Sequence, residues 1–79
     1  MPPRVQKHWQ DRAKRLLKAE LTRRGITYRE LAARLQAIGV KDSERGISNK
    51  ISRGGFTAAF LIQVMDVIGC RTLHLGADD

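Results

Sequence analysis

The sequence predicts an all-α domain of four to five short helices. Three observations support this fold class. Apolar residues recur at spacings of three and four along most of the chain, capping residues or glycines flank each such run, and the runs are separated by only two to five residues. The length of 79 residues allows one domain at most. We expect that domain over residues 9–70, a flexible N-terminal arm over residues 1–8 and a tail over residues 71–79.

The first helix is predicted from about residue 8 to residue 24. Its basic side chains fall mainly opposite its apolar ones, and Gly25 stands at the position after the helix end that favours glycine. Trp9 is expected to cover the core rather than to stack on a base. The predicted apolar stripe comprises Trp9, Ala13, Leu16, Leu17 and Leu21.

The second helix begins with the pattern of a capping box. Thr27 is the expected N-cap with Glu30 three residues later, and Ile26 and Leu31 flank them as a hydrophobic staple. Gly39 is expected to end the helix. Its predicted buried stripe comprises Leu31, Ala32, Leu35 and Ile38.

The third helix is predicted from about residue 43 to residue 53. Asp42 or Ser43 can cap it, and the pair Gly54-Gly55 stops it. Its apolar positions are Ile47 and Ile51 only. The helix should therefore bury one narrow stripe and leave the rest of its surface exposed.

The fourth helix is predicted over residues 58–68, with Thr57 as its N-cap and Gly69 at its end. Because it is apolar on most of its circumference, it should be the central helix or should also pack on a partner. The segment that follows, residues 71–75, alternates in polarity. It is compatible with a short strand that pairs across a dimer, and equally with a capping coil.

The charge is concentrated in the first three-quarters of the chain. The net charge is +7, but residues 1–56 carry 14 basic and 5 acidic side chains, whereas residues 57–79 carry 1 basic and 3 acidic ones. Such a distribution favours a polyanion as the partner of the first part and packing as the role of the second.

The predicted third helix carries the functional signal. A capped helix, a short turn with glycine and a second short helix form the order of a helix-turn-helix, whose second helix enters the DNA major groove. Its outward residues have the chemistry that reads bases: arginine suits guanine, asparagine suits adenine and serine suits either. This face is expected to contain no acid. The predicted base-contacting residues are Arg45, Ser48, Asn49 and Ser52.

Phosphate contacts are predicted at the edges of the same unit. Tyr28 and Arg29 stand at the start of the second helix, where backbone amides favour an anion. Lys50 and Arg53 flank the recognition face, and Lys41 lies in the turn.

Several stretches between residue 17 and about residue 68 carry a further signal: Leu21–Thr27, Glu30–Leu35, Ile47–Ser48, Arg53–Gly54, and Phe60–Leu61 through Ile68–Gly69. In these stretches the sequence resembles the helix-turn-helix domains of the Cro and phage-repressor type, the XRE family. The resemblance implies a lambda-repressor-like fold, DNA binding through the third helix and often a homodimer, within a divergent bacterial subgroup. This sequence departs from the family in its longer turn and in isoleucines four rather than three residues apart.

Other classes of protein are disfavoured. No apolar run is long enough to span a membrane, and the first residues lack the apolar region of a secretory signal, so a cytoplasmic protein is expected. The resemblance implies that it is bacterial and nucleoid-associated. Cys70 cannot form an internal disulfide and should be a small buried residue at a helix end. No metal or cofactor site is predicted, and no set of side chains has the spacing of a catalytic group.

Sequence-specific binding of double-stranded DNA, in a small transcriptional regulator, is therefore the predicted function. The alternative is a protein-interaction module, either antitoxin-like or a homodimeric scaffold that uses the fourth helix and the tail. Binding of structured RNA is supported by charge alone.

Overall fold

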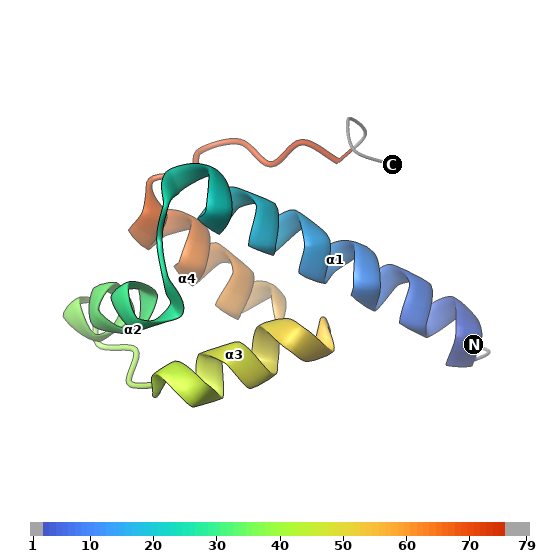
Figure 1. Ribbon diagram of the computed structural model, residues 1–79, viewed down its shortest axis with the longest axis horizontal. Helices are drawn as coiled ribbons and strands as arrows, with labels where there is room; N and C mark the ends of the chain where they lie inside the picture. The colour runs from blue at the N-terminus through green and yellow to red at the C-terminus, as the bar shows by residue number, and fades with distance from the viewer. Residues whose placement is uncertain (1–2, 76–79) are drawn as a thin grey trace.

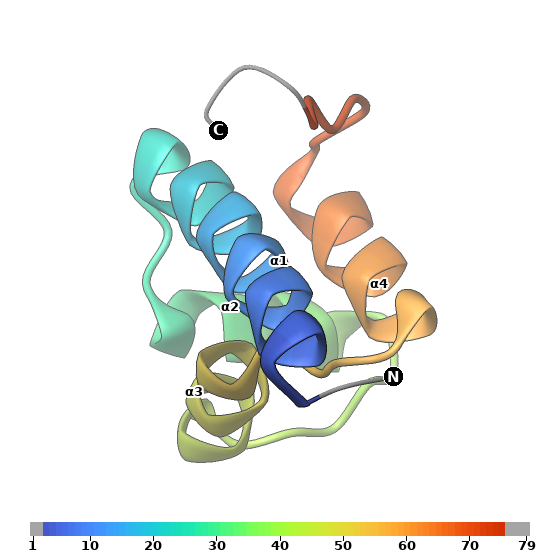
Figure 2. The same ribbon diagram turned by 90° about the vertical axis from the view of Figure 1, so that its right-hand side faces the viewer.

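The protein is all-α, and the computed structural model describes residues 3–75. Its four helices are α1 (Pro3–Arg24), α2 (Tyr28–Ala37), α3 (Glu44–Arg53) and α4 (Ala58–Ile68), and none of the described residues is in a strand. Long helix α1 lies beside α4 on one side of the molecule, while α2 and α3 lie on the other (Figures 1 and 2). Helix α1 packs on α3 and α4, and α2 packs on the same two helices.

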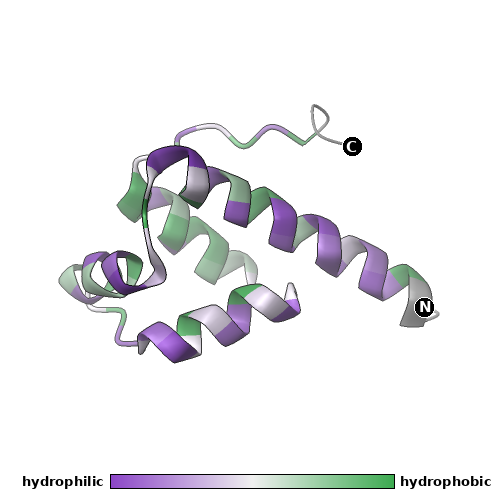
Figure 3. Cartoon of the chain, viewed as in Figure 1, coloured by the Kyte–Doolittle hydropathy of each residue, from purple (hydrophilic) through white to green (hydrophobic). Residues whose placement is uncertain are grey.

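One core joins all four helices. Six of its side chains, from every helix, have no exposed surface, and α4 is the most apolar helix (Figure 3). The predicted N-caps are confirmed: the hydroxyls of Thr27, Ser43 and Thr57 accept hydrogen bonds from the amides three residues later, at 3.1, 2.9 and 3.0 Å. The core comprises Leu17, Leu21, Ile26, Leu31, Leu35, Ile47, Ile51, Phe60, Val64, Ile68 and Cys70.

Helix α1 begins earlier than predicted. It starts at Pro3, so residues 3–8 continue the helix and the expectation of a separate flexible arm over residues 1–8 is wrong for them; residues 1–2 lie outside the described part. Proline is well suited to a first helical position because it has no amide hydrogen to leave unpaired there.

Two predicted core positions, Trp9 and Ile38, lie at the surface instead, and Leu16 is only partly buried. Trp9 is 51 % exposed because α1 is twice as long as its neighbours and its first half extends beyond most of the bundle. Ile38 is 49 % exposed. Helix α2 ends one residue before it, and Gly39, at φ +88°, turns the chain away from the core.

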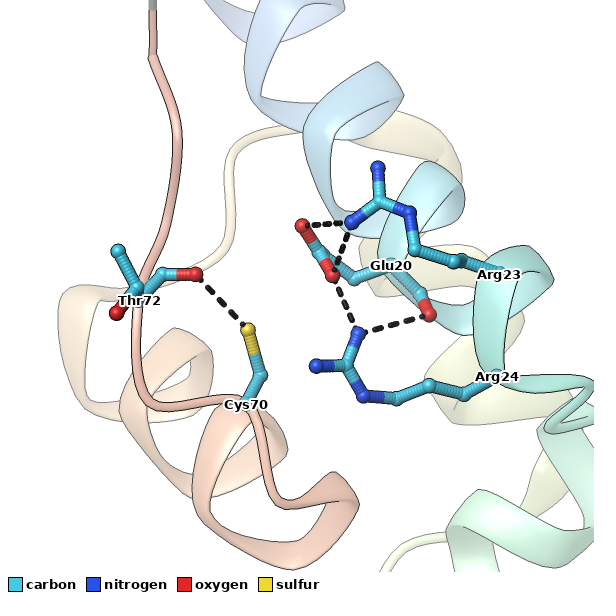
Figure 4. Close-up of polar contacts among 5 residues, drawn as sticks. All are labelled: Glu20, Arg23, Arg24, Cys70 and Thr72. Carbon is cyan, nitrogen blue, oxygen red and sulfur yellow. Dashed lines mark hydrogen bonds and ion pairs between the residues drawn. The ribbon is translucent and has the colours of Figure 1, made fainter.

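The tail beyond α4 is a coil over residues 71–75, and residues 76–79 of the predicted tail lie outside the described part. Arg12 on α1 donates a hydrogen bond to the carbonyl of Leu75, so this end of the coil lies against α1. Cys70 is buried at the end of α4, as predicted, and its thiol donates to the carbonyl of Thr72 at 3.2 Å (Figure 4).

Candidate nucleic-acid interface

Helix α3 is fixed by a narrow apolar stripe. Ile47 and Ile51 have no exposed surface, and they face the core formed with α1 and α2. Ser43 caps the first turn by accepting from the Gly46 amide. At the other end Gly54 adopts a left-handed conformation, φ +70°, that closes the last turn. The helix is thus held along one side and at both ends, as predicted.

The opposite side of α3 is open. Arg45, Asn49, Ser52 and Arg53 are exposed and Ser48 is partly so. All four residues predicted to contact bases therefore share one accessible face. The expectation that acids are absent there needs a correction at one edge, since Glu44 is exposed beside Arg45. An acid in the first turn suits the positive end of the helix dipole.

A surface hollow joins the start of α2 to the first half of α3. It has a volume of about 330 Å³ and is lined by Tyr28, Glu44, Arg45 and Ser48; we call it the Tyr28 hollow. Burial raises the pKa of the Tyr28 phenol above its ordinary value of 10.0, so the hydroxyl is a neutral donor at physiological pH. The tertiary structure thus brings one predicted phosphate contact beside two predicted base contacts.

Two of the other predicted phosphate contacts lie apart from this hollow. Arg29, on the first turn of α2, and Lys41, in the connection between α2 and α3, are both exposed. Neither lines the Tyr28 hollow. Lys41 belongs to the connection that enters α3 at its N-terminal end (Figure 1).

Lys50 has protein partners that the sequence did not reveal. Its ammonium lies 2.5 Å from the carboxylate of Asp42, which precedes the N-cap of α3, and 5.2 Å from the centre of the Phe60 ring. The Asp42 side chain is only 15 % exposed. Lys50 therefore links the segment before α3 to Phe60 on α4, in addition to its predicted contact with phosphate.

The C-terminal end of α3 faces the first half of α1 across a second concavity. This α1–α3 groove has a volume of about 530 Å³. It contains the predicted contacts Lys50, Ser52 and Arg53, and it adds residues of α1 that the sequence pattern did not identify. The residues that line it are Lys7, Gln10, Asp11, Lys14, Lys50, Ser52, Arg53, Gly55 and Phe56.

A signal for these α1 residues existed in the sequence. Lys7, Gln10 and Lys14 are spaced by three and four residues, which puts them on one face of a helix. The prediction of a separate arm over residues 1–8 excluded Lys7 from that helix, and the contact with α3 is a tertiary one that spacing does not reveal.

Two kinds of feature are absent from residues 3–75. Among these residues no three side chains of His, Cys, Asp or Glu come together as ligands for a metal ion. No helix among them has both the length and the apolar character needed to cross a membrane.

Comparison with known proteins gives a family but no activity. No curated protein and no solved structure matches the chain. The profile of one family, described as a domain of unknown function (DUF6471), matches residues 9–73, which include α2, α3, α4 and most of α1. The chain therefore belongs to the DUF6471 family.

Proposed function

We propose that this protein binds double-stranded DNA in a sequence-specific manner, as a small transcriptional regulator in the bacterial cytoplasm. One observation carries the proposal. Helix α3 buries only Ile47 and Ile51, while its exposed side presents guanidinium, amide and hydroxyl groups in a strongly basic part of the chain. A helix held in this way can enter the major groove without losing its packing on the domain.

The roles of the side chains follow from their places on α3. Arg45, Asn49 and Ser52 are exposed along one side of the helix, and they would read base edges together with Ser48. Tyr28, beside Arg45 and Ser48, would donate its neutral hydroxyl to a phosphate. This division is that of a helix-turn-helix, in which α3 reads the sequence and the start of α2 holds the strand.

Selection from a random duplex library tests the proposal directly. An enriched motif supports it, and a palindrome with half-sites about 34–36 Å apart would also indicate a dimer. Arg45→Ala should then cost about 1–3 kcal/mol on the selected duplex and relax the preference at one position. Arg71→Ala is a suitable control because it removes an equal charge from an exposed site beyond α4. Equal losses on selected and random duplexes for Arg45→Ala would refute base reading.

The alternative function, a protein-interaction module, is favoured by one feature of α4. Ile62 is 67 % exposed, and Leu75 in the tail is 58 % exposed. Exposed apolar side chains on a small domain suit a partner or a second copy of the chain. Sedimentation at high concentration tests the dimer: a species of twice the mass supports it, and a monomer of 8.9 kDa refutes it.

A further inference from the structure

The α1–α3 groove is built around one close backbone contact. Gly54 packs so closely on Gln10 that a Cβ atom at Gly54 would overlap the backbone carbonyl of Gln10. The neighbouring Gly55 lies against the Gln10 side chain, whose Nε2 would be 3.2 Å from a Cβ at Gly55. These contacts fix the end of α3 against α1, so the groove beside them has a defined shape.

The same contact determines which face of α1 lines the groove. Lys7 and Lys14 are three residues before and four residues after Gln10, so they lie on its side of the helix. Both line the groove opposite Ser52 and Arg53. Four cationic side chains from two helices therefore converge on one open concavity: Lys7, Lys14, Lys50 and Arg53.

Two acids reduce this positive charge only in part. Asp11, the one acid among the described lining residues, approaches Lys14 at 3.9 Å, the outer limit of an ion pair. Asp42 pairs closely with Lys50. Because lysine and arginine head groups outnumber Asp11 by four to one in the lining, the groove suits an anion.

The position of the groove indicates which anion. Ser52 and Arg53 belong both to the exposed face of α3 and to the groove lining, so the two surfaces are continuous. The first half of α1 extends beyond the C-terminal end of α3 (Figure 1). Lys7 and Lys14 are about 10 Å apart along the helix axis, so they can reach different phosphates of one DNA strand.

We propose that the α1–α3 groove binds the phosphodiester backbone of the DNA strand that borders the major groove at the C-terminal end of α3. The proposal rests on the proposed function and deepens it. Lys7 and Lys14, on the α1 side of the groove, neutralise phosphates that α3 itself does not reach. Arg53, on the α3 side, contacts the same strand. The contacts are independent of base sequence, so they set the orientation of α3 and the affinity for any duplex.

The salt dependence of duplex binding tests this inference. The variant Lys7→Ala/Lys14→Ala should lower the slope of log K against log salt concentration by about 1.8, or about 0.9 for each lost phosphate contact. The loss should be equal on a selected duplex and a random one. Arg15→Ala/Arg71→Ala is the matched control: it also removes two exposed cations, but neither lines the groove, so its slope should change less.

Two further variants make the test independent of a loss of folding. Lys7→Arg/Lys14→Arg keeps the charge and should restore the slope. Asp11→Asn removes the acid of the groove and should tighten binding to both duplexes at low salt. A slope for Lys7→Ala/Lys14→Ala equal to that of the control, or no effect of Asp11→Asn, would overturn the inference.

The experiments distinguish a wrong groove proposal from a wrong proposed function. If Arg45→Ala relaxes sequence preference but Lys7→Ala/Lys14→Ala behaves as the control does, the proposed function stands and the groove proposal falls. If Lys7→Ala/Lys14→Ala lowers the slope but no variant of α3 alters sequence preference, phosphate binding by the groove is supported and base recognition by α3 is refuted. Absence of salt-dependent duplex binding by the unmodified protein overturns both.

Discussion

Gly54 closes the end of α3 directly against the backbone carbonyl of Gln10 on α1. It meets two requirements at once: its φ is +70°, which side chains disfavour, and a Cβ atom there would overlap Gln10. Gly25 meets only the first, since its φ is +67° and a Cβ atom added there would meet no atom within 4 Å. Substitutions at these two glycines therefore separate the free-energy cost of placing a side chain at positive φ from the cost of disrupting the contact with Gln10.

Replacing these two glycines should have unequal effects. Gly25→Ala should lower the free energy of unfolding by about 1–2 kcal/mol, the cost of a left-handed residue with a Cβ atom. Gly54→Ala should lower it further, because α3 must also move away from α1. Urea unfolding measures both. Equal losses would show that the contact with Gln10 contributes nothing.

The buried isoleucines of α3 should be essential to the fold. Ile51 has no exposed surface, so Ile51→Ala should lower the free energy of unfolding by about 2–5 kcal/mol through lost burial and a residual cavity. Ile62→Ala, at a position that is 67 % exposed, is the control and should change it by less than about 1 kcal/mol. Thermal unfolding followed by circular dichroism provides the measurement. A small effect at position 51 would contradict the packing of α3.

Glu20 should make stability depend on pH. Burial raises the pKa of its carboxyl, but hydrogen bonds and charges from Arg24 and Arg23 outweigh burial, so the pKa lies below the ordinary value of 4.5 (Figure 4). Arg23 donates to both carboxylate oxygens at 2.9 Å. A lowered pKa in the folded state stabilises the fold above the unfolded-state pKa, and this contribution is lost as the pH falls through the folded-state pKa.

The variant Glu20→Gln tests this dependence. It should reduce stability at neutral pH and reduce the loss of stability between about pH 5 and pH 3, because the titrating group is gone. Glu30→Gln is the control: the Glu30 side chain is 46 % exposed and pairs with Arg34 one turn away, so its effect should be small. Unfolding midpoints measured across this pH range would contradict the assignment if Glu20→Gln kept the acid sensitivity of the unmodified protein.

Lys50 should contribute to stability as well as to DNA binding. Lys50→Ala leaves the mostly buried Asp42 carboxylate without this cation, which should cost about 1 kcal/mol of unfolding free energy. Lys41→Ala, at an exposed site in the preceding connection, should leave stability unchanged. Adding Asp42→Asn to Lys50→Ala should recover part of the loss in urea unfolding. No recovery in the double variant would argue against the ion pair.

Local sequence signals predicted the helices of this protein well. Thr27, Ser43 and Thr57 are confirmed as N-caps, and Gly54 and Gly69 as C-caps, because capping depends on side chains and φ values within a few residues. The narrow stripe of Ile47 and Ile51 likewise identified the buried side of α3. The exposed position of the four candidate base-contacting residues follows from that stripe alone.

Local sequence patterns did not predict which side chains are covered by other helices or which side chains from separate elements meet. Spacing predicted that Trp9 and Ile38 are buried. Trp9 is exposed because α2 to α4 are half as long as α1, and Ile38 is exposed because α2 ends one residue before it. The pairing of Lys50 with Asp42 and the approach of Lys7 and Lys14 to Arg53 join separate elements. The sequence by itself determined the helices and the polar face of α3. Only the packing of α1 on Gly54 determined that residues of α1 form one side of the α1–α3 groove.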